Sequence, residues 1–235
     1  MKIFVDIETI PDQTPGSLEA IKASIKPPAN YSKPDSIAKW LEDNAAAEAD
    51  KQWRKTALSG TSGEIIVIGF AFDESDSVDS MHRFPGESEA DLLRQFWNVI
   101  DQGVADRNGH WSGVEWIGHN VAFDLRFLKQ RGLVNGIQSP VKLNPDARHG
   151  AGHVFCTMQE WAGYRDTVSL DALCKALGIA SPKDEGINGA QVFDLWRFGK
   201  AALIVEYCRR DVEAVQALYR RMNPPRMLFD LEAAA

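Results

Sequence analysis

The sequence predicts an α/β protein built on a mixed sheet. Two observations favour this fold class: three strand-like runs come early in the chain, and strand and helix patterns alternate after them. The length of 235 residues favours one domain, and 44% hydrophobic with 25% charged residues is typical of a globular protein. This composition argues against global disorder, a collagen-like repeat or a disulfide scaffold.

Apolar runs and helical spacing place the individual elements along the chain. Strands are expected at residues 2–8, 64–72, 77–84 and 114–118. Residues 73–76 are the expected turn of a hairpin formed by the second and third strands. An amphipathic helix follows Pro85-Gly86, and further helical patterns lie near residues 121–131, 158–163, 169–177, 190–197 and 201–222.

The connection between the first two strands is unusually long. Residues 21–62 contain six Lys and one Arg against five acidic residues, a local charge of +2, which leaves −9 for the rest of the chain. A connection of this length is usually functional or flexible. We expect an insertion at about 21–62, either a surface segment with a covering helix or a lid that grips substrate. Residues 1–225 are expected to form the domain, and residues 226–235 a C-terminal tail, native or left by cloning.

The charge and the cysteines limit the possible partners and the compartment. A net charge of −7 and a pI near 5.3 argue against a protein that coats duplex DNA through a basic face. Three cysteines without a C-x-x-C pair favour a reduced, cytoplasmic protein. The first residues do not resemble a signal peptide, and no apolar run approaches the ~20 residues that span a bilayer. We therefore expect no membrane association.

Two acids lie in the first predicted strand. Because side chains alternate along a strand, Asp6 and Glu8 share a face that is opposite to that of Ile7. In a central strand both faces are covered, so the two carboxylates would repel each other unless a cation neutralised them. An edge strand with one face in water is the alternative, and D-x-E alone does not exclude it.

Two predicted helices also carry acids on faces that should be buried. Asp124 lies beside the apolar stripe of the helix after Asn120, the expected N-cap, although an acid in a first turn also complements the helix dipole. Asp211 interrupts an apolar face of the last helix, and Tyr207 lies one turn before it. A structural Asp bonded to a core Tyr is the alternative there.

A pair of divalent cations would explain all four acids together. Two metals ~4 Å apart can activate a water molecule and stabilise the leaving oxygen of an in-line phosphoryl displacement. Tyr207 would then orient the attacking water or help to activate it.

These residues resemble a known superfamily. D-I-E-T at 6–9, H-N-x-x-F-D at 119–124 and Y-x-x-x-D at 207–211 are similar, in type and order, to the motifs of the DnaQ-like (DEDD) 3′–5′ exonucleases. The DEDDh branch has a His where Glu206 stands, whereas Tyr207 is typical of the DEDDy branch. Residues 169–178 resemble a helix of stand-alone proteins related to the exonuclease domain of family B DNA polymerases.

The resemblance implies a fold, ligands and an activity. The fold would be ribonuclease-H-like, a mixed five-stranded sheet flanked by helices, with the first three strands antiparallel. Two Mg²⁺ or Mn²⁺ ions would be bound by Asp6, Glu8, Asp124 and Asp211. Residues expected near the terminal nucleotide or a phosphate are Thr9, Asn120, Phe123 and Lys183, although Lys183 is equally well explained as a solvated loop charge.

The expected activity is hydrolysis from the 3′ end of single-stranded DNA, with release of nucleoside 5′-monophosphates. An exoribonuclease and a catalytically silent nucleic-acid-binding module remain as alternatives. The sequence departs from the family in the 21–62 insertion and in Cys156, which stands where related chains often have Asp. His149, His153 and Cys156 have a spacing that suits zinc, but they lack the fourth ligand of a structural site.

Overall fold

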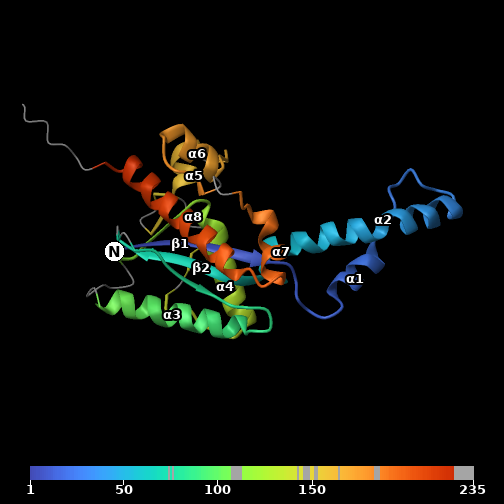
Figure 1. The fold of residues 1–235 in the computed structure, drawn as a ribbon, viewed down its shortest axis with the longest axis horizontal. Helices are drawn as coiled ribbons and strands as arrows, with labels where there is room; N and C mark the ends of the chain where they lie inside the picture. The colour runs from blue at the N-terminus through green and yellow to red at the C-terminus, as the bar shows by residue number, and fades with distance from the viewer. Residues whose placement is uncertain are drawn as a thin grey trace, which may run out of the picture.

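The computed structural model of the chain describes residues 1–73, 75, 77–106, 113–141, 143–144, 149–150, 153–163, 165–182 and 186–224. A five-stranded sheet with the order β3-β2-β1-β4-β5 forms its centre (Figure 1). The strands are β1 (Lys2–Ile10), β2 (Glu64–Phe72), β3 (Asp79–His82), β4 (Glu115–Gly118) and β5 (Val154–Cys156).

Strand β1 is the central strand of this sheet. It pairs antiparallel with β2 and parallel with β4. Strand β3 pairs antiparallel with β2, and β5 pairs parallel with β4. The expected mixed, five-stranded α/β sheet is therefore confirmed, and the first strand is buried between two neighbours.

Helices cover both faces of the sheet. The helices of the described residues are α1 (Ser17–Ser24), α2 (Pro34–Lys55), α3 (Glu89–Asp106), α4 (Val121–Val134), α5 (Thr157–Ala162), α6 (Leu170–Leu177), α7 (Val192–Arg197) and α8 (Ala201–Met222). Helices α3 and α4 pack on the face of β1 that presents Ile3, Val5 and Ile7. Helix α8 packs on the Phe4 face. No helix in the described part of the chain is both long and apolar enough to cross a membrane.

The predicted elements agree with these bounds to within a few residues, with two exceptions. Strand β5 is only three residues long, so it has no periodic pattern in the sequence. A fifth strand is expected from the family resemblance alone. The insertion contains two helices, α1 and α2, where the sequence indicated one helical piece near Trp40. Residues 74 and 76 of the predicted hairpin turn lie outside the described residues.

Helices α1 and α2 form an arm, residues 17–55, that extends away from the sheet instead of covering it (Figure 1). The two helices pack on each other through a small apolar cluster of their own, made of Leu18, Ile21, Ile25, Trp40, Leu41, Ala45 and Ala49. The alternative of a lid that closes on substrate stays a prediction.

The base of the arm is attached to α7 and to the segment after β1 by specific contacts. The Trp53 indole N–H donates to the Asp12 carbonyl at 2.9 Å, and its ring packs edge-on against Phe193 of α7 at 4.9 Å. The Arg54 guanidinium donates two hydrogen bonds, of 3.0 and 3.2 Å, to the Asp194 carboxylate. These contacts hold the arm in one direction relative to β1.

Candidate active site

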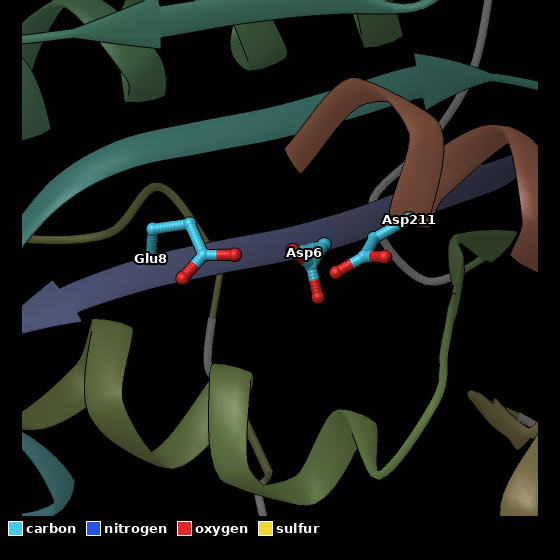
Figure 2. Close-up of side chains that lie close together, drawn as sticks. All are labelled: Asp6, Glu8 and Asp211. Atoms are coloured by element: carbon cyan, nitrogen blue, oxygen red, sulfur yellow. The ribbon is translucent and has the colours of Figure 1, made fainter. Parts of the chain in front are cut away.

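Three carboxylates meet where α8 crosses the central strand. Asp6 and Glu8 come from β1 and Asp211 from α8, and a ligand oxygen from each lies within 4.8 Å of the others (Figure 2). Glu8 and Asp211 are only 8% and 7% exposed, and Asp6 is partly buried. The structure thus brings together acids that are separated by about 200 residues in the chain.

The alternation of side chains along β1 and one glycine of β2 explain why these carboxylates come close together. Asp6 and Glu8 lie on the Phe4 face, which α8 covers, as the strand pattern predicts. Asp6 pairs with Gly69 of β2. A Cβ atom on Gly69 would lie 2.9 Å from the Cys208 sulfur, so the missing side chain lets α8 come close enough for Asp211 to reach the strand.

The fourth acid, Asp124, lies in the first turn of α4 and is 4% exposed. Its Oδ1 accepts a hydrogen bond of 3.2 Å from the backbone N–H of Ile7, the residue between Asp6 and Glu8. Asp124 is not one of the three acids within 4.8 Å of one another, but its charge raises the pKa of both Asp6 and Glu8. We call these four acids the acid cluster.

Burial and mutual repulsion oppose ionisation of the acid cluster. Burial is the main reason that the pKa values of Asp6 and Glu8 are well above the usual range, and the negative charge of Asp211 raises both further. Burial raises the pKa of Asp124 to about 8, although the hydrogen bond from Ile7 acts in the opposite direction. A divalent cation would offset this repulsion, and a set of carboxylate oxygens suits hard ions such as Mg²⁺ or Mn²⁺.

Tyr207 lies one helical turn before Asp211 and is 6% exposed. Burial raises the pKa of its phenol, and the negative charges of Asp211, Glu8 and Asp6 raise it further. The side chain is also hydrogen-bonded to Asp211. The sequence prediction that the phenol and this carboxylate are neighbours is confirmed.

Cys208 is a contact of the acid cluster that the sequence did not indicate. Its thiol donates to the Asp6 carboxylate, with Sγ 3.4 Å from Oδ2, and lies 3.6 Å from the Asp6 carbonyl oxygen. The helical spacing placed Cys208 on the buried face with Asp211, but that face could equally have met only apolar side chains. The contact with Asp6 depends on the close approach at Gly69, which no local pattern shows.

The residues predicted to bind substrate differ in their exposure and in their contacts. The Thr9 hydroxyl donates to the Ala57 carbonyl at 2.7 Å, beside the base of the arm. Asn120 is the N-cap of α4 in a left-handed conformation, with an exposed side chain that makes no capping hydrogen bond. Phe123 is half-buried and packs on Phe127 at 5.4 Å. Lys183 lies outside the described residues.

The structure does not support the zinc alternative. The His149 Nδ1 atom accepts the backbone N–H of Cys156 at 3.2 Å, and its Nε2 atom pairs with Glu160. His153 contacts the Val114 carbonyl oxygen at 3.4 Å. Within the described ranges, the group formed by Asp6, Glu8 and Asp211 is the one set of three or more potential ligands that meets within 4.8 Å.

Comparison with known proteins agrees with this arrangement. The chain is 28% identical over 181 residues to an uncharacterized protein of Methanocaldococcus jannaschii, and the alignment covers 70% of this chain and 89% of that protein. A family described as a predicted 3′–5′ exonuclease related to the exonuclease domain of PolB matches residues 60–234. The match includes the second and third motifs, with Asp124, Tyr207 and Asp211, begins after the first motif, and confirms the resemblance to this family. The sheet is consistent with a ribonuclease-H-like exonuclease fold. The chain therefore belongs to the family of predicted 3′–5′ exonucleases related to the exonuclease domain of PolB.

Proposed function

We propose that the protein is a metal-dependent 3′–5′ exonuclease of the DEDDy type that acts on single-stranded DNA and releases nucleoside 5′-monophosphates. The observation that carries this proposal is the acid cluster itself. Four carboxylates from one strand and two helices lie in a largely buried position, where their charges repel one another. Such an arrangement disfavours the metal-free, ionised state, so a cation-binding role explains it better than a structural role.

Each residue of the site has a proposed role. Asp6, Glu8, Asp124 and Asp211 would hold two Mg²⁺ or Mn²⁺ ions. When bound, these ions would lower the pKa of a water molecule and stabilise negative charge on the leaving oxygen. Tyr207, bonded to Asp211, would orient the attacking water.

Two residues at the start of α4, close in sequence to Asp124, are suited to contact with a nucleotide at the strand end. Asn120 presents an exposed amide at the start of α4, one turn before Asp124, and the half-buried Phe123 offers an aromatic ring on the same turn. We propose that these two side chains contact the terminal nucleotide. Because the Thr9 hydroxyl is bonded to Ala57, we propose that Thr9 contributes to the shape of the site and keeps that bond.

The test is digestion of 5′-labelled, single-stranded DNA and RNA oligonucleotides in Mg²⁺, Mn²⁺ or EDTA. We expect DNA to give a ladder that shortens from the 3′ end, and EDTA to abolish it. Asp6→Ala and Asp211→Ala should also abolish it and weaken Mn²⁺ binding measured by calorimetry. Glu213→Gln, which removes an exposed carboxylate from the same helix α8, is the matched control and should digest DNA normally.

Several outcomes would contradict the proposal. Efficient cleavage in EDTA would refute a metal-dependent mechanism. Internal cuts in circular single-stranded DNA would indicate an endonuclease. Digestion of RNA in preference to DNA would keep the mechanism and correct the substrate, because the four motif acids do not discriminate the sugar and 2′-hydroxyl recognition depends on the shape of the pocket around them.

A further inference from the structure

The arm has a basic end far from the acid cluster. Residues 22–41 include Lys22, Lys26, Lys33 and Lys39, all exposed, and only one acid, Asp35. The segment has a net charge of +3, so the rest of the chain, at −7 overall, has −10. We call residues 22–41 the tip of the arm. A polyanion would be attracted to this tip more than to the rest of the surface.

A hollow of about 290 Å³ with an aromatic wall lies between the tip and the next turn of α2, with one cation, Lys39, and one acid, Asp43, in its lining. Its lining residues are Tyr31, Ser36, Lys39, Trp40, Asp43 and Asn44. The rings of Tyr31 and Trp40 are half-buried, 6.1 Å apart and inclined by 54°. Aromatic side chains beside a cation are the combination that binds single strands, because bases stack on the rings and phosphates pair with the cation.

The arm connects the tip to the strand that carries part of the acid cluster. Strand β1, which carries Asp6 and Glu8, leads directly to α1, and the arm returns to the sheet at Ala57, which accepts the Thr9 hydroxyl. The 22 residues of α2 make the helix about 33 Å long. A stacked strand at about 3.4 Å per nucleotide would need about ten nucleotides to cover that length.

We propose that the tip of the arm binds single-stranded nucleic acid upstream of the 3′ end that occupies the acid cluster. This inference rests on the proposed function for the identity of the strand. The matched family region begins at residue 60, so the arm lies outside the part of the chain that matches the family. The base of the arm is held by Trp53 and Arg54, and the tip lies at the far end of α2 from these contacts. A long strand would contact both places at once, whereas a short strand would contact only one of them.

Fluorescence anisotropy in EDTA tests this binding without hydrolysis. The probes are 5′-labelled single strands of 5 and 25 nucleotides. The double substitution Lys33→Glu/Lys39→Glu should weaken binding of the 25-nucleotide strand at least tenfold. It should also reduce the slope of a plot of log Kd against log salt concentration by about 1.4, the value for two lost phosphate contacts. The 5-nucleotide strand cannot bridge the two places, so we expect the wild type to bind it more weakly than the 25-nucleotide strand. The matched control, Lys129→Glu/Lys200→Glu, makes the same charge change at two exposed lysines outside the arm and should retain the affinity of the wild type.

A second variant tests the aromatic wall. Tyr31→Ala should weaken binding of the 25-nucleotide strand about fivefold or more, while Tyr31→Phe should bind as the wild type does, because a ring is sufficient for stacking. Circular dichroism of both variants should match that of the wild type, since Tyr31 is not part of the apolar cluster of the arm. Equal weakening by Tyr31→Phe would overturn the stacking role.

The two proposals fail in different ways. If the tip variants leave binding of the 25-nucleotide strand unchanged, or weaken it no more than Lys129→Glu/Lys200→Glu does, the inference about the arm is wrong even if the enzyme digests DNA. If the wild type binds the long strand through the tip but hydrolyses no substrate in Mn²⁺, the proposed activity is wrong and the binding site stands. Competition by polyglutamate as strong as that by unlabelled DNA would overturn the inference in favour of an acidic protein partner.

Discussion

Replacing Asp124 by Asn should stabilise the metal-free protein at neutral pH, although the same change should damage the proposed activity. Asp124 is buried, and its pKa is about 8. Asn has nearly the same shape, and its side-chain oxygen can accept the Ile7 N–H that now bonds to Oδ1 of Asp124. The substitution therefore removes the ionisable carboxyl group and keeps the hydrogen bond.

The magnitude and the sign follow from the pKa difference. An unfolded Asp has a pKa of about 3.9, so its raised pKa in the folded protein means that the folded state holds its proton more tightly. Below about pH 4 both states are protonated and the penalty is absent. Between about pH 4 and 8 the penalty grows by up to about 1.4 kcal/mol per pH unit, and above pH 8 it is constant. At pH 7 the limit is about 4 kcal/mol, and because water reaches the partly exposed Asp6, we expect about 2–4 kcal/mol.

The assay is urea unfolding in EDTA at pH 5, 6, 7 and 8, followed by circular dichroism. Asp124→Asn should be more stable than the wild type at pH 8, and the difference should shrink toward pH 5. Glu213→Gln should stay within about 0.5 kcal/mol of the wild type throughout. Mn²⁺ should stabilise the wild type more than the variant, because it binds the folded carboxylates. A variant that is no more stable at pH 8, or whose advantage does not depend on pH, would refute the reasoning.

Three further substitutions test other parts of the structure. Tyr207→Phe should slow turnover with Mn²⁺ affinity largely kept, and loss of calorimetric Mn²⁺ binding would contradict a role in orienting water. Gly69→Ala places a Cβ 2.9 Å from the Cys208 sulfur, so it should lower the free energy of unfolding in urea by about 1–3 kcal/mol and weaken Mn²⁺ binding. Unchanged values of both would show that α8 shifts to make room for the added methyl group. Glu89→Gln breaks a buried ion pair with Arg131, whose closest N–O distance is 2.6 Å. The free energy of unfolding should fall by about 3–5 kcal/mol, and a fall of less than 1 kcal/mol would contradict a stabilising role for the pair.

The parts of the fold that the sequence predicted are those with a local signal. Strand β2, Glu64–Phe72, is apolar from its second residue onward, and its bounds agree with the predicted 64–72. Helix α8 repeats its apolar residues every three or four positions over 22 residues. Strand β5 has three residues, and its place at the sheet edge depends on pairing with β4, a long-range contact that no local pattern contains.

The same limit applies to the site. Asp6, Glu8 and Asp211 were recognisable because each carries a charge on a face that should be apolar. The contact between Cys208 and Asp6 joins residues 202 positions apart, and a thiol on a buried face has the same pattern as any small apolar side chain. The projection of the arm was also beyond the sequence, because its direction depends on the Arg54–Asp194 contact across 140 residues.

Strand register connects the stability of this fold to its proposed chemistry. On β1, Ile3, Val5 and Ile7 pack into the core beneath α3 and α4, while Asp6 and Glu8 face α8. A slip by one residue would exchange the two faces and place both acids in the apolar core. The apolar packing of one face therefore holds the repelling carboxylates on the other, and the pairing of Asp6 with Gly69 leaves room for Asp211. Because the core and the acid cluster depend on one register, a substitution that loosens β1 should lower metal affinity and the free energy of unfolding together.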